Sequence, residues 1–145
     1  PLEECPNLTR LITGSMPEGA AETLAGLTGL EELRLYSTPG LDLTLFAGFR
    51  KLRALDVFGS TVSHPDALSG LPGLDYVNLG ETGVRDLSFL PSMQALRHLD
   101  LRENPLTDLT PLLACPWLEQ LALSPYHQEL VREQLAGAAF SVEYF

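Results

Sequence analysis

Three polar residues of different chemistry alternate with leucine in the segment His98-Leu99-Asp100-Leu101-Arg102. A strand places alternate side chains on one side, so all three are expected on an exposed strand face. An imidazole, a carboxylate and a guanidinium in a row could perform acid–base catalysis. The same residues could form a polar strip that binds a partner. We favour the strip, because a flat or gently curved strand surface offers no desolvated cavity of the kind that active sites use.

The other chemistry-bearing residues do not point to catalysis, a cofactor or a metal. The sequence contains neither a GxxxxGK phosphate loop nor a GxSxG nucleophile turn. The histidines His64, His98 and His127 lie far apart in three different parts of the chain and show no metal-ligand spacing, and neither do the two cysteines. We therefore predict that the chain is not an enzyme and holds no cofactor and no metal.

Leucine, which supplies 31 of the 145 residues, recurs at a fixed interval. The lead leucines follow one another at a constant spacing: Leu8, Leu30, Leu52, Leu74, Leu96 and Leu118. Apolar residues also lie three and five positions after nearly every lead leucine, which is the alternation of a strand with one buried face. Further apolar columns follow ten, sixteen and nineteen positions after it. The 12 glycines and 11 prolines argue against a coiled coil, which does not tolerate frequent breakers.

The best copies of this pattern are LRALDVFGSTV, LDYVNLGETGV and LRHLDLRENPL. They resemble the leucine-rich repeat, L-x-x-L-x-L-x-x-N-x-L, in a short 22-residue form similar to internalin-like and phosphatase-regulator-like repeats. The resemblance covers about residues 2–124. It implies an α/β repeat fold, a right-handed solenoid with a parallel sheet on the concave face and 3₁₀ or short helical segments on the convex side. Independently, one such unit cannot bury its apolar face alone, whereas stacked units share a continuous core.

The position of the repeat's asparagine, eight residues after each lead leucine, varies along the chain. Its occupants are Met16, Thr38, Ser60, Thr82, Asn104 and Tyr126. In the family this asparagine bonds to backbone groups at a tight turn. A hydroxyl donates one hydrogen bond where an amide donates two, so we expect a thinner ladder with Thr38, Ser60 and Thr82 as substitutes. The alternative is that these are solvated turn residues.

Two units depart from the pattern on their later half. Gly40 occupies an apolar slot and Leu41 follows it, which predicts a shifted turn. Pro65 replaces an apolar residue in the next unit, and we expect it to bend the convex side there.

The chain is interpreted as a single domain of residues 1–145, with repeats over about 8–124 and a C-terminal cap over about 125–145. Leu2 and Cys5 fall in the columns sixteen and nineteen positions after a lead leucine that would precede residue 1, so the chain begins in mid-repeat. Either the sequence is trimmed from a longer protein, which we favour, or residues 1–7 form a makeshift end.

The C-terminal segment leaves the repeat register and is predicted to cap the last unit. Residues 127–138 form a predicted helix with Leu130, Val131 and Leu135 on one side. After it, Phe140, Val142 and Tyr144 alternate as a predicted last strand.

The cysteines Cys5 and Cys115 occupy the same core column five units apart. Stacked strands about 4.8 Å apart would separate them by roughly 24 Å, whereas a disulfide needs Cα atoms within about 7 Å. We expect both to be small buried side chains that do not pair with each other. Unpaired cysteines fit a reducing compartment, and we predict the cytoplasm.

The outward positions of the strands lie two, four and six residues after each lead leucine, and their residue types are irregular. The candidate partner-binding residues among them are Tyr36, Phe58, Tyr76, Arg34, Asp56, His98, Asp100 and Arg102. Aromatic residues and arginine are enriched as anchors of protein interfaces. We therefore favour a binding face over the alternative that the aromatic side chains pack against one another and against neighbouring side-chain stems as ordinary cross-strand pairs.

The net charge of −10 argues against a nucleic-acid partner and would steer a basic one. No apolar run approaches the length of a membrane span. We predict a non-catalytic protein–protein interaction module that binds a protein partner, which the charge allows to be basic, on its concave face, and neither nucleic acid nor a membrane. Two alternatives stay open: a targeting or substrate-recruiting module of a larger enzyme whose catalytic domain lies outside this chain, and a toxin-neutralising immunity protein.

Overall fold

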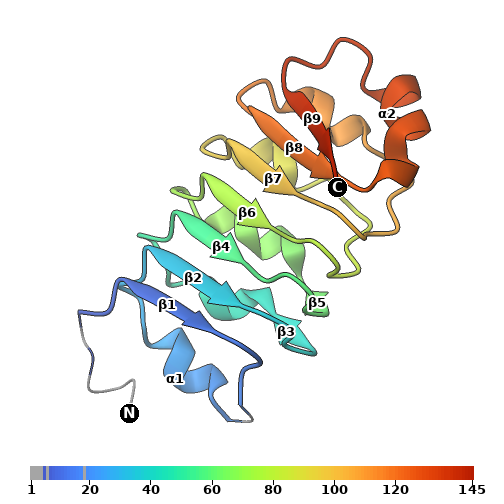
Figure 1. The fold of residues 1–145 in the computed structure, drawn as a ribbon. Coiled ribbons are helices and arrows are strands. Elements are labelled where there is room, and N and C mark those ends of the chain that lie inside the picture. Colours follow the sequence, from blue (N-terminus) through green and yellow to red (C-terminus); the bar gives the residue numbers. More distant parts are fainter. Residues whose placement is uncertain (1–4, 6, 18) are drawn as a thin grey trace.

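The computed structural model describes residues 5, 7–17 and 19–145, which form a stack of repeating strand-and-helix units (Figure 1). Seven parallel strands make one sheet in the order β1-β2-β4-β6-β7-β8-β9, and β3 pairs with β5 in a second, two-stranded sheet. The bounds of the strands are β1 Arg10–Thr13, β2 Glu32–Leu35, β3 Leu41–Asp42, β4 Ala54–Asp56, β5 Val62–Ser63, β6 Tyr76–Asn78, β7 His98–Asp100, β8 Gln120–Leu123 and β9 Ser141–Tyr144.

The sheet register follows the sequence repeat. Arg10 pairs with Glu32, and every later pair up to Gln120 keeps the same interval along the chain. The last pair, Gln120 with Ser141, is one residue shorter, because β9 belongs to the C-terminal cap. The predicted parallel sheet of a leucine-rich-repeat solenoid is therefore confirmed.

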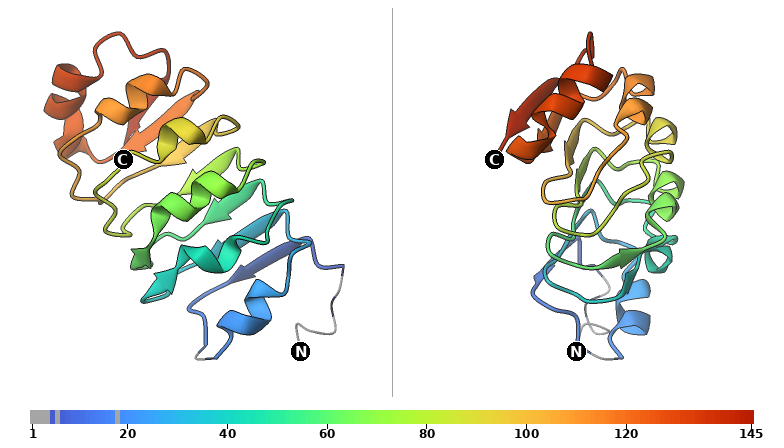
Figure 2. Two further views of the ribbon diagram at one scale, coloured as in Figure 1. Left: turned by 180° about the vertical axis from the view of Figure 1, so that it is seen from behind. Right: turned by 90° about the vertical axis from the view of Figure 1, so that its right-hand side faces the viewer.

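Short helical segments cover the opposite side, which bulges outward while the strand side is concave (Figure 2). They are α1 Ala21–Ala25 and the 3₁₀ helices η2 Leu43–Phe46, η3 Pro65–Gly70, η4 Leu90–Ser92 and η5 Thr110–Ala114. Pro65 is the first residue of η3, where its missing N–H costs no hydrogen bond. The residue before it, His64, takes the left-handed conformation with φ 54°.

The core lies between the sheet and the helical side, and the leucine columns build it. From Leu30 onward every lead leucine is buried, as are the residues three and five positions after it. The helical side contributes its own buried column of Leu24, Phe46, Leu68, Leu90 and Leu112. Gly40 has φ 65° and Leu41 is buried. Leu41 pairs with Val62, a partner one position nearer in the chain than the interval of the main sheet, which confirms the predicted shift of this turn.

The turn ladder is thinner at its hydroxyl positions, as predicted. Thr38, Ser60 and Thr82 are at most 2% exposed, which excludes solvated turn residues. The Thr38 N–H donates to Ser60 Oγ over 3.0 Å, and Ser60 Oγ donates in turn to Leu35 O. The hydroxyl of Ser60 therefore joins two neighbouring units through few bonds.

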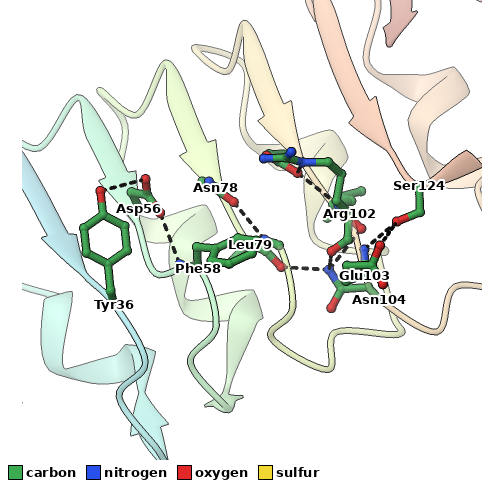
Figure 3. A network of polar contacts seen from close by, with 12 residues as sticks. Tyr36, Asp56, Phe58, Asn78, Leu79, Arg102, Glu103, Asn104 and Ser124 are labelled. Atoms are coloured by element: carbon green, nitrogen blue, oxygen red, sulfur yellow. Dashed lines mark hydrogen bonds and ion pairs between the residues drawn. The ribbon is translucent and has the colours of Figure 1, made fainter. Parts of the chain in front are cut away.

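Asn104 makes the richest set of turn contacts. Its amide nitrogen donates to Leu79 O over 2.7 Å (Figure 3) and to Leu101 O over 3.1 Å. Its oxygen accepts from the backbone N–H of Val84 and of Thr82. The side chain is fully buried, so these bonds satisfy groups that water cannot reach.

The C-terminal cap consists of η6 (Pro125–His127), α2 (Gln128–Gln134) and β9. The helix is shorter than the predicted span of 127–138, since its first turn is 3₁₀ and it ends before the buried Leu135. The predicted last strand is confirmed, and Val142 and Tyr144 pair with Leu121 and Leu123 on the core side.

The two cysteines differ in burial. Cys115 is 2% exposed, and burial raises the pKa of its thiol to about 11. Cys5 is exposed, so the prediction that both are buried is wrong for Cys5. Its carbonyl still accepts from the Leu8 N–H, as the equivalent carbonyls of later units do, for example Leu27 from Leu30. The position predicted for Leu2 lies outside the described residues.

Both thiols are free. In the part of the chain that the structure describes, no helix has the length and apolar character needed to cross a membrane.

Candidate functional site

The candidate site is the concave face, the outward side of the seven-stranded sheet. We divide it into an N-terminal half on β1, β2 and β4 and a C-terminal half on β6, β7, β8 and β9. Most of the predicted binding residues are half-buried: Tyr36, Phe58, Tyr76, Arg34, His98 and Arg102. Asp56 and Asp100 are buried instead.

The buried polar residues form one column, four positions after the lead leucine. Asp56, Asn78 and Asp100 are 6–8% exposed, so the expectation that Asp100 and Asp56 lie exposed is wrong. Alternation puts them on the correct side, but each side-chain Oδ1 turns back and accepts from the backbone N–H two residues later, over 3.1, 2.9 and 3.0 Å. Such short side chains close the end of a three-residue strand and are then covered by larger neighbours.

Polar side-chain contacts link neighbouring strands in the N-terminal half. Glu32 pairs with Arg10 Nε over 2.9 Å and with Arg34 Nε over 2.7 Å. The hydroxyl of Tyr36, the residue that follows β2, donates to Asp56 Oδ2 on β4 over 3.4 Å (Figure 3). Hydrogen bonding to Tyr36, and then to Glu32, raises the pKa of Arg34. Burial is the main cause that raises the pKa of the Asp56 carboxyl.

The aromatic residues of the face do not stack on one another. The ring contacts among the described residues, Phe46 with Phe49 and Tyr126 with His127, lie elsewhere. Phe58 instead covers Gly80, where an added Cβ would come within 2.7 Å of its ring. Of the two contacts in the alternative, packing of these rings on one another is not seen among the described residues, whereas packing on the neighbouring unit is seen for Phe58.

In the C-terminal half, Asp100 holds the Arg102 side chain through three hydrogen bonds. Arg102 Nε donates to Oδ1 at 3.0 Å and to Oδ2 at 2.9 Å, and Nη2 donates to Oδ2 at 2.6 Å. The Arg102 guanidinium also lies over the ring of Phe145, 5.1 Å from its centre. Sequence reasoning missed Phe145 and Glu143. The signal was present, because Glu143 and Phe145 alternate with the core-facing Val142 and Tyr144.

A hollow of about 150 Å³ opens in this half, between β6 and β9. Its lining side chains include Tyr76, His98, Asp100, Gln120, Ala122 and Glu143. Burial, followed by the nearby charges of Asp56 and Asp100, raises the pKa of Tyr76.

The arrangement of His98 and Asp100 does not resemble a catalytic pair. Both Asp100 oxygens accept from Arg102, and no bond joins Asp100 to His98 within the described structure. The described residues also include no group of three His, Cys, Asp or Glu side chains that could hold a metal ion. The face is an open strand surface with a small depression in its C-terminal half.

Solved structures share this architecture. Internalin C2 from Listeria monocytogenes superposes with a TM-score of 0.75 at 25% identity, over 99% of this chain and 64% of that one. A leucine-rich-repeat protein from Leptospira interrogans gives 0.75 at 22% identity, over 99% and 38%. The chain has the leucine-rich-repeat fold. A second Listeria internalin, InlF, matches this leucine-rich-repeat chain with a TM-score of 0.68 at 22% identity, over 99% of it and 48% of InlF.

This leucine-rich-repeat chain thus spans between 38% and 64% of the length of these neighbours. No protein-family model matches it, and no curated protein matches it in sequence. Leucine-rich-repeat solenoids present extended curved surfaces and serve in general as protein-interaction modules. The fold therefore supports a protein-interaction module, while the face and the partner have to be argued from the site.

Proposed function

We propose that the chain is a non-catalytic recognition module that binds a protein partner on its concave face. The observation that carries the proposal is the half-buried state of Tyr36, Phe58 and Tyr76, which lie on the face without stacking on one another. Aromatic side chains held in this way present large, rigid contact area at a small loss of conformational entropy.

The charge supports a partner that is a basic protein, and not nucleic acid. With 19 acidic and 9 basic residues the chain repels a phosphate backbone and attracts a positive surface. We also propose that the chain does not bind a membrane surface. We propose the cytoplasm as the compartment, because an exposed free thiol such as Cys5 survives best under reducing conditions.

The test is a double substitution, Tyr36→Ala with Phe58→Ala, after a partner has been identified by affinity capture from the source organism. The partner's dissociation constant should rise by roughly thirtyfold, equivalent to about 2 kcal/mol, if these residues are hot spots. Isothermal titration calorimetry measures the change, and circular dichroism checks that the variant is folded.

Leu113→Ala is the matched control, because Leu113 is an exposed hydrophobic residue of η5 on the convex side. It should leave the affinity unchanged. If the control weakens binding and the folded double variant does not, the partner binds the convex side and the proposal is wrong.

A further inference from the structure

We propose that the hollow in the C-terminal half is a socket for one lysine or arginine side chain of the protein partner. This inference rests on the proposed function and gives the concave face a chemical preference. It is argued from the size of the hollow, from a carboxylate beside it that has no partner among the described residues, and from a guanidinium that the same face already holds.

The hollow is smaller than a usual small-molecule site and is better suited to a single side chain. Its volume is about 150 Å³, whereas sites for small molecules and cofactors usually enclose about 300–1,000 Å³. Ala122 creates the space, because the column that it occupies carries Arg34, Asp56, Asn78 and Asp100 in the preceding units. A single extended side chain can enter here while the rest of the partner lies along the strands.

The charge of the hollow comes from Glu143. Asp100 is also part of the lining, but the Arg102 guanidinium binds it and neutralises it. Glu143 pairs with Ala122 in the sheet register and therefore stands directly beside the space that the small side chain leaves. Its carboxylate is exposed and has no hydrogen-bond or ion-pair partner among the described residues.

Arg102 shows how this part of the face holds a cation. Its guanidinium lies between the Asp100 carboxylate and the Phe145 ring. The hollow offers the same two elements to a partner, the Glu143 carboxylate and the half-buried ring of Tyr76. A cation near an aromatic face gains about 0.5–1 kcal/mol even at exposed sites, and its aliphatic stem can pack on Ala122.

The experiment uses a random peptide library displayed on phage and selected on the whole purified chain. Enriched peptides are synthesised and titrated, and each lysine is also replaced by norleucine, which removes the charge at similar length. The protein variants are Glu143→Gln, Ala122→Leu, which fills the hollow, and the control Glu133→Gln. Glu133 is exposed on α2 and undergoes the same change of charge away from the face.

The socket predicts peptides that share a lysine or arginine. Glu143→Gln and the norleucine replacement should each weaken binding about fivefold at low salt, as expected for an exposed ion pair. Combined, they should weaken it little further, because both remove the same contact. Ala122→Leu should weaken binding tenfold or more, and Glu133→Gln should have no effect.

The other outcomes separate the two proposals. Peptides that bind the concave face, as judged by Tyr36→Ala with Phe58→Ala, but show no basic residue and ignore Glu143→Gln would overturn the socket and leave the proposed function intact. Peptides that ignore all concave-face variants, or a library that yields no binder, would count against both.

Discussion

The two halves of the concave face use the same strand geometry in different ways. In the N-terminal half the charged and polar side chains pair across strands, as Arg10 does with Glu32 and Tyr36 with Asp56. In the C-terminal half the contact from Arg102 to Phe145 passes over β8, and the hollow opens beside Ala122. Within the described structure, one half satisfies its own polar groups, while the other leaves space and the unpaired carboxylate of Glu143.

The turns that follow the strands also differ between the two halves. Beneath the N-terminal half the ladder consists of the single hydroxyls of Thr38 and Ser60. Beneath the C-terminal half it is built around Asn104. The open surface therefore rests on the more strongly bonded scaffold, which is the arrangement that a preformed binding site requires.

The largest effect that tests this comparison is expected from Asn104→Ala. The substitution leaves the backbone N–H groups of Thr82 and Val84 without the oxygen that accepts from them, and the Leu101 carbonyl without the amide that donates to it. Each such group costs about 1–3 kcal/mol, so we expect the free energy of unfolding to fall by about 3 kcal/mol or more. Urea denaturation followed by circular dichroism measures the loss.

Ser60→Ala is the matched variant in the N-terminal half. It deprives Thr38 N–H of an acceptor and Leu35 O of the hydroxyl that donates to it. We expect a loss of about 1–2 kcal/mol. Equal losses in the two variants would show that the two ladders are equally strong and would remove this part of the comparison.

The second effect concerns Gly80, at the junction of the two halves. A Cβ added there would lie 2.7 Å from Phe58 Cδ2, so Gly80→Ala must move the ring. We expect a loss of stability of about 1–3 kcal/mol, the usual cost of overpacking. Gly14→Ala is the control in the same column, because no heavy atom of the described residues lies within 4 Å of the position that its Cβ would take.

A double variant decides whether the Phe58 ring is the cause. In Gly80→Ala with Phe58→Ala the loss should be smaller than the sum of the two single losses, because the clash is gone. Additive losses, measured by the same denaturation, would place the strain in the backbone instead.

The third effect is a dependence on pH that arises in the cap. His127 is 3% exposed, and neither ring nitrogen has a hydrogen-bond partner among the described residues. Burial lowers its pKa below the ordinary 6.5, so the unfolded chain binds a proton more readily than the folded one. The free energy of unfolding therefore has its full value, as far as His127 is concerned, above about pH 6.5. It declines as the pH falls through that value, because protonation of His127 then favours the unfolded chain.

His127→Leu should remove this decline, and the difference between the two proteins isolates it. The raised pKa of Asp56 acts in the opposite direction but is common to both. Hydrogen exchange should show the loss of protection at β9 before β2, since His127 belongs to the cap. A decline that persists in His127→Leu would assign the pH dependence to another group, and His64→Gln serves as the control for an exposed histidine.

The fold was predictable from sequence because its core is periodic. The leucine columns at fixed spacing specified the strands, and the departure from them at Gly40 marked the shifted turn. The alternation of Phe140, Val142 and Tyr144 predicted the last strand of the cap, and all of these are confirmed. The hydroxyl ladder was predictable for the same reason, since Thr38, Ser60 and Thr82 recur at one position of the repeat. Periodic burial leaves a signal in residue types that a single sequence can reveal.

The candidate site was harder to predict because its contacts are not periodic. Alternation placed Asp100 on the correct side but could not show that its side chain returns to its own backbone and is covered by Arg102. The hollow exists because position 122 carries only the small side chain of alanine. Its far side is formed by β9, which follows β8 in the sequence at a shorter interval than the repeat, so the repeat pattern did not include it. Cys5 was misjudged because a place in an apolar column does not by itself ensure burial, as the half-buried Leu27 of the same column also shows.

The smallest effect is expected from Glu32→Gln in the N-terminal half. Glu32 bridges Arg10 and Arg34, but its side chain is 24% exposed and water screens both pairs. We expect a loss of at most about 1 kcal/mol, which disappears at high salt. Glu119→Gln, whose partner Arg97 is 3.7 Å away and whose side chain is 64% exposed, should lose nothing measurable. Denaturation at low and high salt compares the two variants. If Glu32→Gln and Glu119→Gln lose the same stability, the ion pairs of the N-terminal half do not stabilise the fold. The two halves would then differ in the shape of their surface and not in the energy of their charge pairs.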